Sequence, residues 1–103
     1  MQISLEDFFQ TAIALRNKYD ANEDDPAKDY KIAAIALMVQ EVVWLGKVPT
    51  SFELKFPVVS NSQWVKTPIL NLYKDFGVEL KIVQEKKFSS TCGSNCIICF
   101  AIK

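Results

Sequence analysis

The sequence predicts a single α+β domain spanning residues 1–103, with elements in the order α-α-β-α-β-β. Two segments with cap residues and apolar side chains at helical spacing open the chain. Later segments alternate apolar and charged residues, as half-buried strands do. Half of the residues are hydrophobic, which suits one core in a chain of this length. We expect the second helix to be central and buried, packed on a small, mainly antiparallel sheet.

The first helix is expected to begin after Ser4 and to end near Asp20. Ser4 is a favourable N-cap, and Asp7 follows it three residues later, as in a capping box. The apolar side chains recur at helical spacing at Leu5, Phe8, Phe9, Ala12, Leu15 and Tyr19. The segment is therefore predicted to be a helix with one apolar face.

The acidic connection from Asp20 to Asp25 resembles the opening of an EF-hand calcium loop. The pattern departs from that loop at Asp25, where the sharp turn needs glycine, and at Lys31, where a bidentate glutamate is expected. We interpret the connection as a solvated acidic loop that could attract a basic partner.

The second helix is expected to run from Pro26 to Leu45, with Asp25 as its N-cap and Gly46 as its C-terminal cap. Its middle, Ile32 to Val39, is apolar on every side. A helix that is hydrophobic all round is typically a buried helix. This segment is therefore predicted to be the centre of the fold.

Three strands are expected in the second half of the chain. The segment from Phe52 to Phe56 alternates apolar and charged residues, and Pro57 after it indicates a short strand or an edge strand. The segment from Val78 alternates in the same way and extends to about Phe88. The last strand, Cys96 to Ile102, is apolar on both faces, which is typical of a central strand.

A short third helix is expected from Pro68 to Phe76, opened by Thr67 as its cap. A helix followed by two strands resembles the winged-helix arrangement, which implies nucleic-acid binding. The predicted order departs from that arrangement because a strand separates the second and third helices. The helix itself carries one cation, Lys74, and one anion, Asp75, whereas phosphate contacts require a basic stripe.

The three cysteines have the spacing Cys92-x-x-x-Cys96-x-x-Cys99, which resembles the cluster-binding triplet of radical S-adenosylmethionine enzymes. The resemblance implies three thiolates that hold an iron–sulfur cluster. It covers eight residues, and in those enzymes the triplet comes early in a much longer barrel chain.

A strand places residues three apart on opposite faces and about 10 Å apart, so Cys96 and Cys99 are not expected to share a metal or a disulfide. We interpret them as small buried hydrophobic residues and predict no metal and no cofactor. A cysteine-ligated metal or iron–sulfur protein, with Cys92, Cys96 and Cys99 as ligands, is kept as the alternative.

Catalytic chemistry has little support in the composition. The chain contains no histidine, so neither a Ser–His nor a Cys–His pair can form. Its three glycines are too far apart for a phosphate-binding loop. We predict no catalytic residue, although lysine or carboxylate chemistry stays open.

Charge and targeting signals give the expected location and partners. Twelve basic and twelve acidic residues balance to a formal charge of zero, and Arg16 is the only arginine, which disfavours nucleic-acid recognition. The residues from Met1 to Asp7 lack the features of a signal peptide, and the run from Ile32 to Val39 is shorter than the ~20 residues that span a bilayer. We expect a soluble cytoplasmic protein with reduced thiols and no membrane partner.

By elimination, the sequence favours a small protein that binds another protein, such as an inhibitor, an immunity-type protein or a viral accessory module. A homodimer is one such assembly, because no net charge opposes self-association and two-fold dimers are common. Trp44 and Trp64 are the interface candidates, since large aromatic residues are enriched at interfaces. A metal protein and a winged-helix-like nucleic-acid binder are the alternatives.

Overall fold

The computed structural model describes residues 2–57, 61–90 and 93–103. Within these ranges the chain forms three helices and three strands in the predicted order, α-α-β-α-β-β. The elements are α1 (Leu5–Ala21), α2 (Lys28–Leu45), β1 (Ser51–Pro57), α3 (Gln63–Lys74), β2 (Leu80–Ser90) and β3 (Gly93–Ile102).

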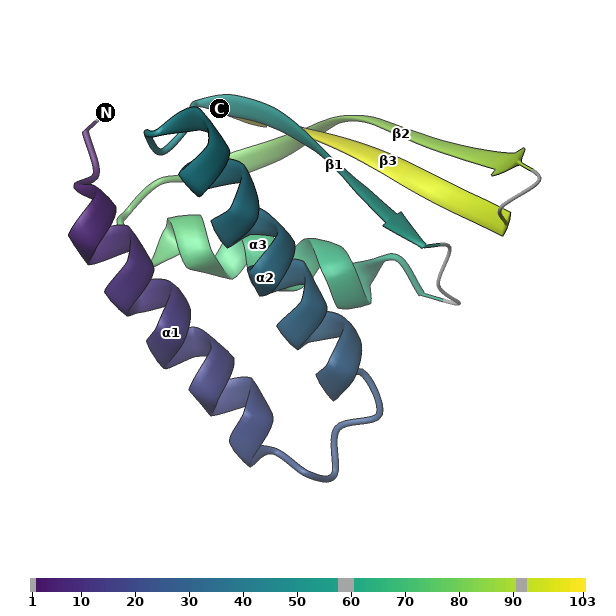
Figure 1. The fold of residues 1–103 in the computed structure, drawn as a ribbon, viewed down its shortest axis with the longest axis horizontal. Helices are drawn as coiled ribbons and strands as arrows, with labels where there is room; N and C mark the ends of the chain where they lie inside the picture. The colour runs from purple at the N-terminus through teal and green to yellow at the C-terminus, as the bar shows by residue number, and fades with distance from the viewer. Residues whose placement is uncertain (1, 58–60, 91–92) are drawn as a thin grey trace.

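The sheet is antiparallel, with the strand order β1-β3-β2. The apolar strand β3 is central, and β1 is an edge strand, as the sequence predicts. Figure 1 shows the helices gathered on one side of this sheet. The alternation in β1 follows from that arrangement, because Phe52, Leu54 and Phe56 are buried while Glu53 and Lys55 are exposed. One face of the sheet therefore belongs to the core, and the other has no helix over it among the described residues.

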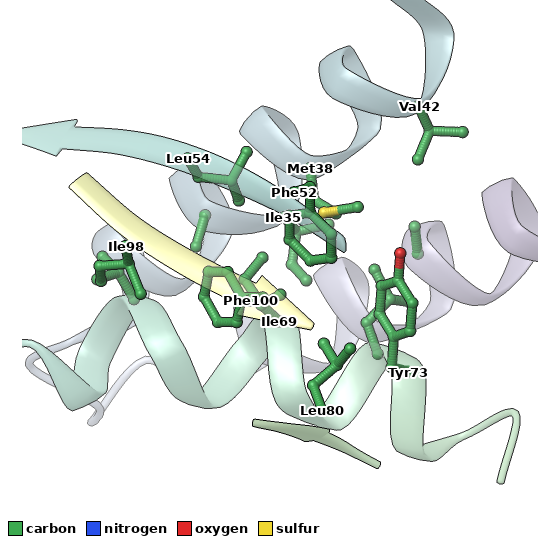
Figure 2. Close-up of a cluster of buried hydrophobic side chains, with 14 of the residues drawn as sticks. Ile35, Met38, Val42, Phe52, Leu54, Ile69, Tyr73, Leu80, Ile98 and Phe100 are labelled. Atoms are coloured by element: carbon green, nitrogen blue, oxygen red, sulfur yellow. The ribbon is translucent and has the colours of Figure 1, made fainter. Parts of the chain in front are cut away.

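The core lies between this inner face and the helices. Figure 2 shows side chains from α2, α3 and the strands that meet there, including Ile35, Met38, Val42, Ile69, Tyr73, Ile98 and Phe100. The Tyr73 hydroxyl is buried and donates a hydrogen bond to the backbone carbonyl of Pro49 at 2.7 Å. This bond ties α3 to the loop before β1, and it satisfies a polar group that would be costly to bury alone.

Helix α2 is the central helix, and it contacts α1, α3 and β1. Its inner side is buried at Ala34, Ile35, Met38 and Val42. The expectation that its apolar middle is covered on every side is wrong, because Ala33 and Ala36 are exposed within it. The side of α2 opposite the buried residues, at Ala33, Ala36 and Gln40, faces outward.

Local cap signals explain the helix boundaries. The Ser4 hydroxyl accepts a hydrogen bond from the Asp7 N–H at 3.0 Å, which confirms the predicted start of α1. Gly46 adopts the left-handed conformation at φ 74° and ends α2 as predicted. The start of α2 is later than predicted, because the Asp25 carboxylate accepts from the Ala27 N–H at 2.8 Å and Pro26 lies in a turn before the helix.

The predicted start of the third helix, at Thr67 and Pro68, is wrong. α3 begins at Gln63, whose N–H donates a hydrogen bond to the Asn61 side chain at 3.0 Å. Pro68 therefore lies inside the helix. A proline in a helix interior removes one backbone hydrogen bond. The added turn buries Val65, and Pro68 is itself buried in the core, which offsets that loss.

We expect neighbouring positions on α2 to respond in opposite ways to a charge. Ile35 is 2% exposed, so Ile35→Asp buries an unpaired carboxylate whose cost approaches the whole stability of a small domain, about 5–15 kcal/mol. Ala36 is exposed, so Ala36→Asp should fold. Circular dichroism and urea unfolding of both variants check this. Equal melting of the two would contradict the orientation of α2.

Candidate interaction surface

The outward side of α2 is an uncharged surface. Its exposed positions from Tyr30 to Gly46 carry no charged side chain. We use the name α2 outer surface for five of these exposed residues, namely Ala33, Ala36, Gln40, Val43 and Trp44. Ala33, Ala36 and Gln40 follow one another at steps of three and four residues, and Val43 and Trp44 lie three and four residues after Gln40, which places all five on one side of the helix. A helix of a monomeric domain normally turns charged or polar residues to this side.

Trp44 is the most exposed large hydrophobic residue of this surface. Its side chain is 87% exposed, and the flanking Val43 and Leu45 are 64% and 41% exposed. The cause is local, because Val42 points into the core and a residue two positions later points about 200° away from it. Trp44 is an interface candidate from the sequence, whereas Val43 and Leu45 are not among the predicted interface residues. The helical spacing of Met38 and Val42 could have identified Val43, because it places these two residues on the buried side of α2 and Val43 away from it.

Trp64 has a different environment. It lies in the first turn of α3, it is half buried, and its ring packs against Tyr30 of α2 with 5.4 Å between the ring centroids. The two interface candidates are therefore unlike. Trp64 contributes to packing between α2 and α3, whereas Trp44 extends from the end of α2 into open space.

The free edge of β1 adjoins α2. The Thr50 carbonyl accepts a hydrogen bond from the Ile102 N–H of β3 at 2.9 Å. Because the backbone groups of successive residues point to alternate sides of a strand, those of residues 51, 53, 55 and 57 point away from β3. Pro57 falls in this outward set, so its missing N–H costs the sheet no bond.

A groove separates this edge from α2. It is lined by Leu37, Gln40 and Glu41 of α2, by Glu53, Leu54 and Lys55 of β1, and by Ile97 of β3. Trp44 follows Leu37 and Gln40 at helical steps of seven and four, so it continues the same row along α2. The free edge and the most exposed tryptophan therefore lie on one continuous part of the molecule.

The acidic connection is engaged within the chain. The Asp25 carboxylate accepts a hydrogen bond from Lys31 Nζ at 2.6 Å, and this bond, with that from Ala27, holds the pKa of Asp25 below its usual value. Asp20 pairs with Lys28 at 3.5 Å. The connection is solvent-exposed from Asp20 to Asp24, as interpreted from the sequence, whereas Asp25 is largely covered and joins the loop to α2.

The other shifted groups also have structural partners. Lys66 of α3 bonds Glu85 of β2 at 2.7 Å, which lowers the pKa of Glu85. Burial raises the pKa of Tyr73, whose hydroxyl is bound to the Pro49 carbonyl. These groups connect one element to another and do not converge on a common cleft.

The cysteines of β3 lie on opposite faces of the sheet. Cys96 points into the core and is 5% exposed, whereas Cys99 is half buried on the outer face. Cys99 Sγ donates to Glu53 Oε2 at 3.7 Å. Burial first, and neighbouring carboxylates second, raise the pKa of both thiols. The interpretation as buried hydrophobic residues thus fits Cys96 and is corrected for Cys99.

A shared metal site would need these thiols on one side. Cys92, the third candidate ligand, lies outside the described residues. Among the residues that the structure does describe, no three His, Cys, Asp or Glu side chains are grouped so that they could hold a metal ion.

Comparison of the chain with known protein families, with curated proteins and with solved structures finds no match. None of the helices in the described ranges is long and apolar enough to cross a membrane.

We expect the two cysteines to differ in both stability and reactivity. Cys96→Ala leaves a small cavity in the core and should cost ~1 kcal/mol, whereas Cys99→Ala at the half-buried position should cost less. Alkylation at neutral pH should modify Cys99 before Cys96, and both slowly, because their raised pKa values keep the thiols protonated. Mass spectrometry and urea unfolding measure both effects. Faster modification of Cys96 would contradict the assigned faces.

Proposed function

We propose that this chain is a non-catalytic protein-binding or assembly module that binds its partner through the α2 outer surface. One observation supports the proposal above the others, namely that Trp44 is 87% exposed beside two exposed aliphatic residues. Tryptophan is among the residues that contribute most to binding at interfaces. Contiguous apolar surface of this kind usually marks an interaction site.

The energy available from this surface is considerable. Removing a tryptophan-sized side chain from water is worth on the order of 4 kcal/mol before the cost of association is subtracted. The surface between Tyr30 and Gly46 needs little desolvation of charge, because its exposed residues are uncharged. The zero net charge of the chain adds no long-range repulsion against a partner.

The two alternatives have less support. A cysteine-ligated metal or cluster would require Cys96 and Cys99 on one face, and they occupy opposite faces. A winged-helix-like reading helix would need a basic stripe, whereas α3 carries two lysines, Lys66 and Lys74, and Lys66 is bound to Glu85 at 2.7 Å. The element order also differs, because β1 comes between α2 and α3 in the chain. Protein binding remains the proposal, in the role of a small inhibitor, immunity-type protein or viral accessory module in the cytoplasm.

Site-specific photo-crosslinking in cells tests the proposal. A benzophenone amino acid at position 44 should give crosslinked products, to a second copy or to another protein, because Trp44 lies within the interface. The same probe at Asn17, an exposed position on α1, is the control. Equal crosslinking from positions 44 and 17 would remove the support for this surface.

A further inference from the structure

We infer that the partner at this surface is a second copy of the same chain, and that the two β1 strands pair antiparallel about a two-fold axis at Leu54. The product is one continuous sheet of six strands, three from each copy. The inference rests on the proposed function, since the β1 edge borders the α2 outer surface at Gln40.

Alternate residues of β1 direct the backbone groups needed for this pairing away from β3. The N–H and C=O groups of Ser51, Glu53 and Lys55 point away from β3, toward the outer edge of the sheet, as the bond from Ile102 to Thr50 requires. Pairing centred on Leu54 sets Glu53 opposite Lys55 of the second copy. The outward-facing N–H and C=O groups of these two residues then bond one another. Pro57 falls opposite Ser51, where the ladder ends.

The charges of β1 select this register. Pairing about Leu54 places each Glu53 against a Lys55, which gives two opposite-charge pairs per dimer. A shift that centres the axis on Glu53 or on Lys55 brings like charges together, and a parallel in-register arrangement does the same. The strand is therefore complementary to itself in one antiparallel alignment.

The inner face continues across the same axis. Phe52, Leu54 and Phe56 are buried in each copy. About Leu54, each Phe52 faces a Phe56 and the two leucines face one another, so apolar side chains meet across the new strand pair. Such cross-strand apolar pairs add to the stability of a sheet.

Helix α2 borders the place where the second strand would lie. Leu37 and Gln40 line the groove beside Leu54, and Trp44 continues their row along the helix. Figure 1 shows α2 passing close to β1 at this edge. A second copy docked on β1 thus lies along the row of Leu37, Gln40 and Trp44 and covers surface that one copy leaves exposed.

The opposite edge of the sheet, at β2, is unsuited to self-pairing. Its register shifts between Ile82 and Gln84, which interrupts a regular ladder. It also carries Lys81, Lys86 and Lys87, and lysines protect edges from pairing. Self-association is thereby directed to β1.

Charge reversal on β1, read by light scattering coupled to size exclusion, tests the inference. The wild-type chain should have the mass of two copies at micromolar concentration. Glu53→Lys alone and Lys55→Glu alone each set like charges opposite one another, so dimerisation should weaken about tenfold or more. An equimolar mixture of the two variants restores opposite charges at every pair and should regain the dimer mass, as should the double variant.

Lys81→Glu on β2 is the matched control, because it reverses an exposed charge on a strand that lies outside the proposed dimer contact, and it should leave the mass unchanged. A single-copy mass for the wild type, or no recovery in the mixture, would overturn the inference. If the mass is that of one copy while position 44 crosslinks to a different protein, self-pairing fails and the proposed function stands. If position 44 also gives no product above its control, both fail.

Discussion

The packing of α1, α3 and β1 against α2 is the constraint on which this structure depends. Ile35, Met38 and Val42 form its inner side, and α1, α3 and β1 all meet there. Each of those elements has a second, outward side of its own. A chain of 103 residues offers no further element within the described ranges to enclose the rest of α2. The apolar content of α2 thus exceeds what one copy buries.

The exposure of Trp44 and the edge position of β1 have the same origin. Both arise where the layer of helices and strands stops, on the side of α2 that faces β1. An isolated small domain buries a limited share of its surface, so remaining apolar area favours association. Assembly would complete the sheet and cover the helix together, which links the binding surface to the incompleteness of the fold.

Local signals in the sequence predict most of the fold. They do not predict features that depend on contacts between residues far apart in the chain. Ser4 and Gly46 cap their helices through residues nearby in the chain, so the sequence predicts both helix ends correctly. The predicted helix start at Pro68 is wrong because the Asn61 side chain accepts a hydrogen bond from the Gln63 N–H, so α3 begins earlier and buries Val65. Composition could not show that α2 has an exposed side, since apolar residues occupy both sides. It also could not separate Trp44 from Trp64, whose difference depends on the position of Tyr30.

Fluorescence of Trp44 as a function of protein concentration tests the central claim most directly, in the variant Trp64→Phe, where Trp44 is the only tryptophan. The account predicts a water-exposed emission that acrylamide quenches at low concentration, and a blue-shifted, protected emission over the concentration range in which the mass doubles. A tryptophan already protected at the lowest concentration would contradict the exposed α2 surface. One that stays quenchable after the mass has doubled would show that association occurs elsewhere on the molecule.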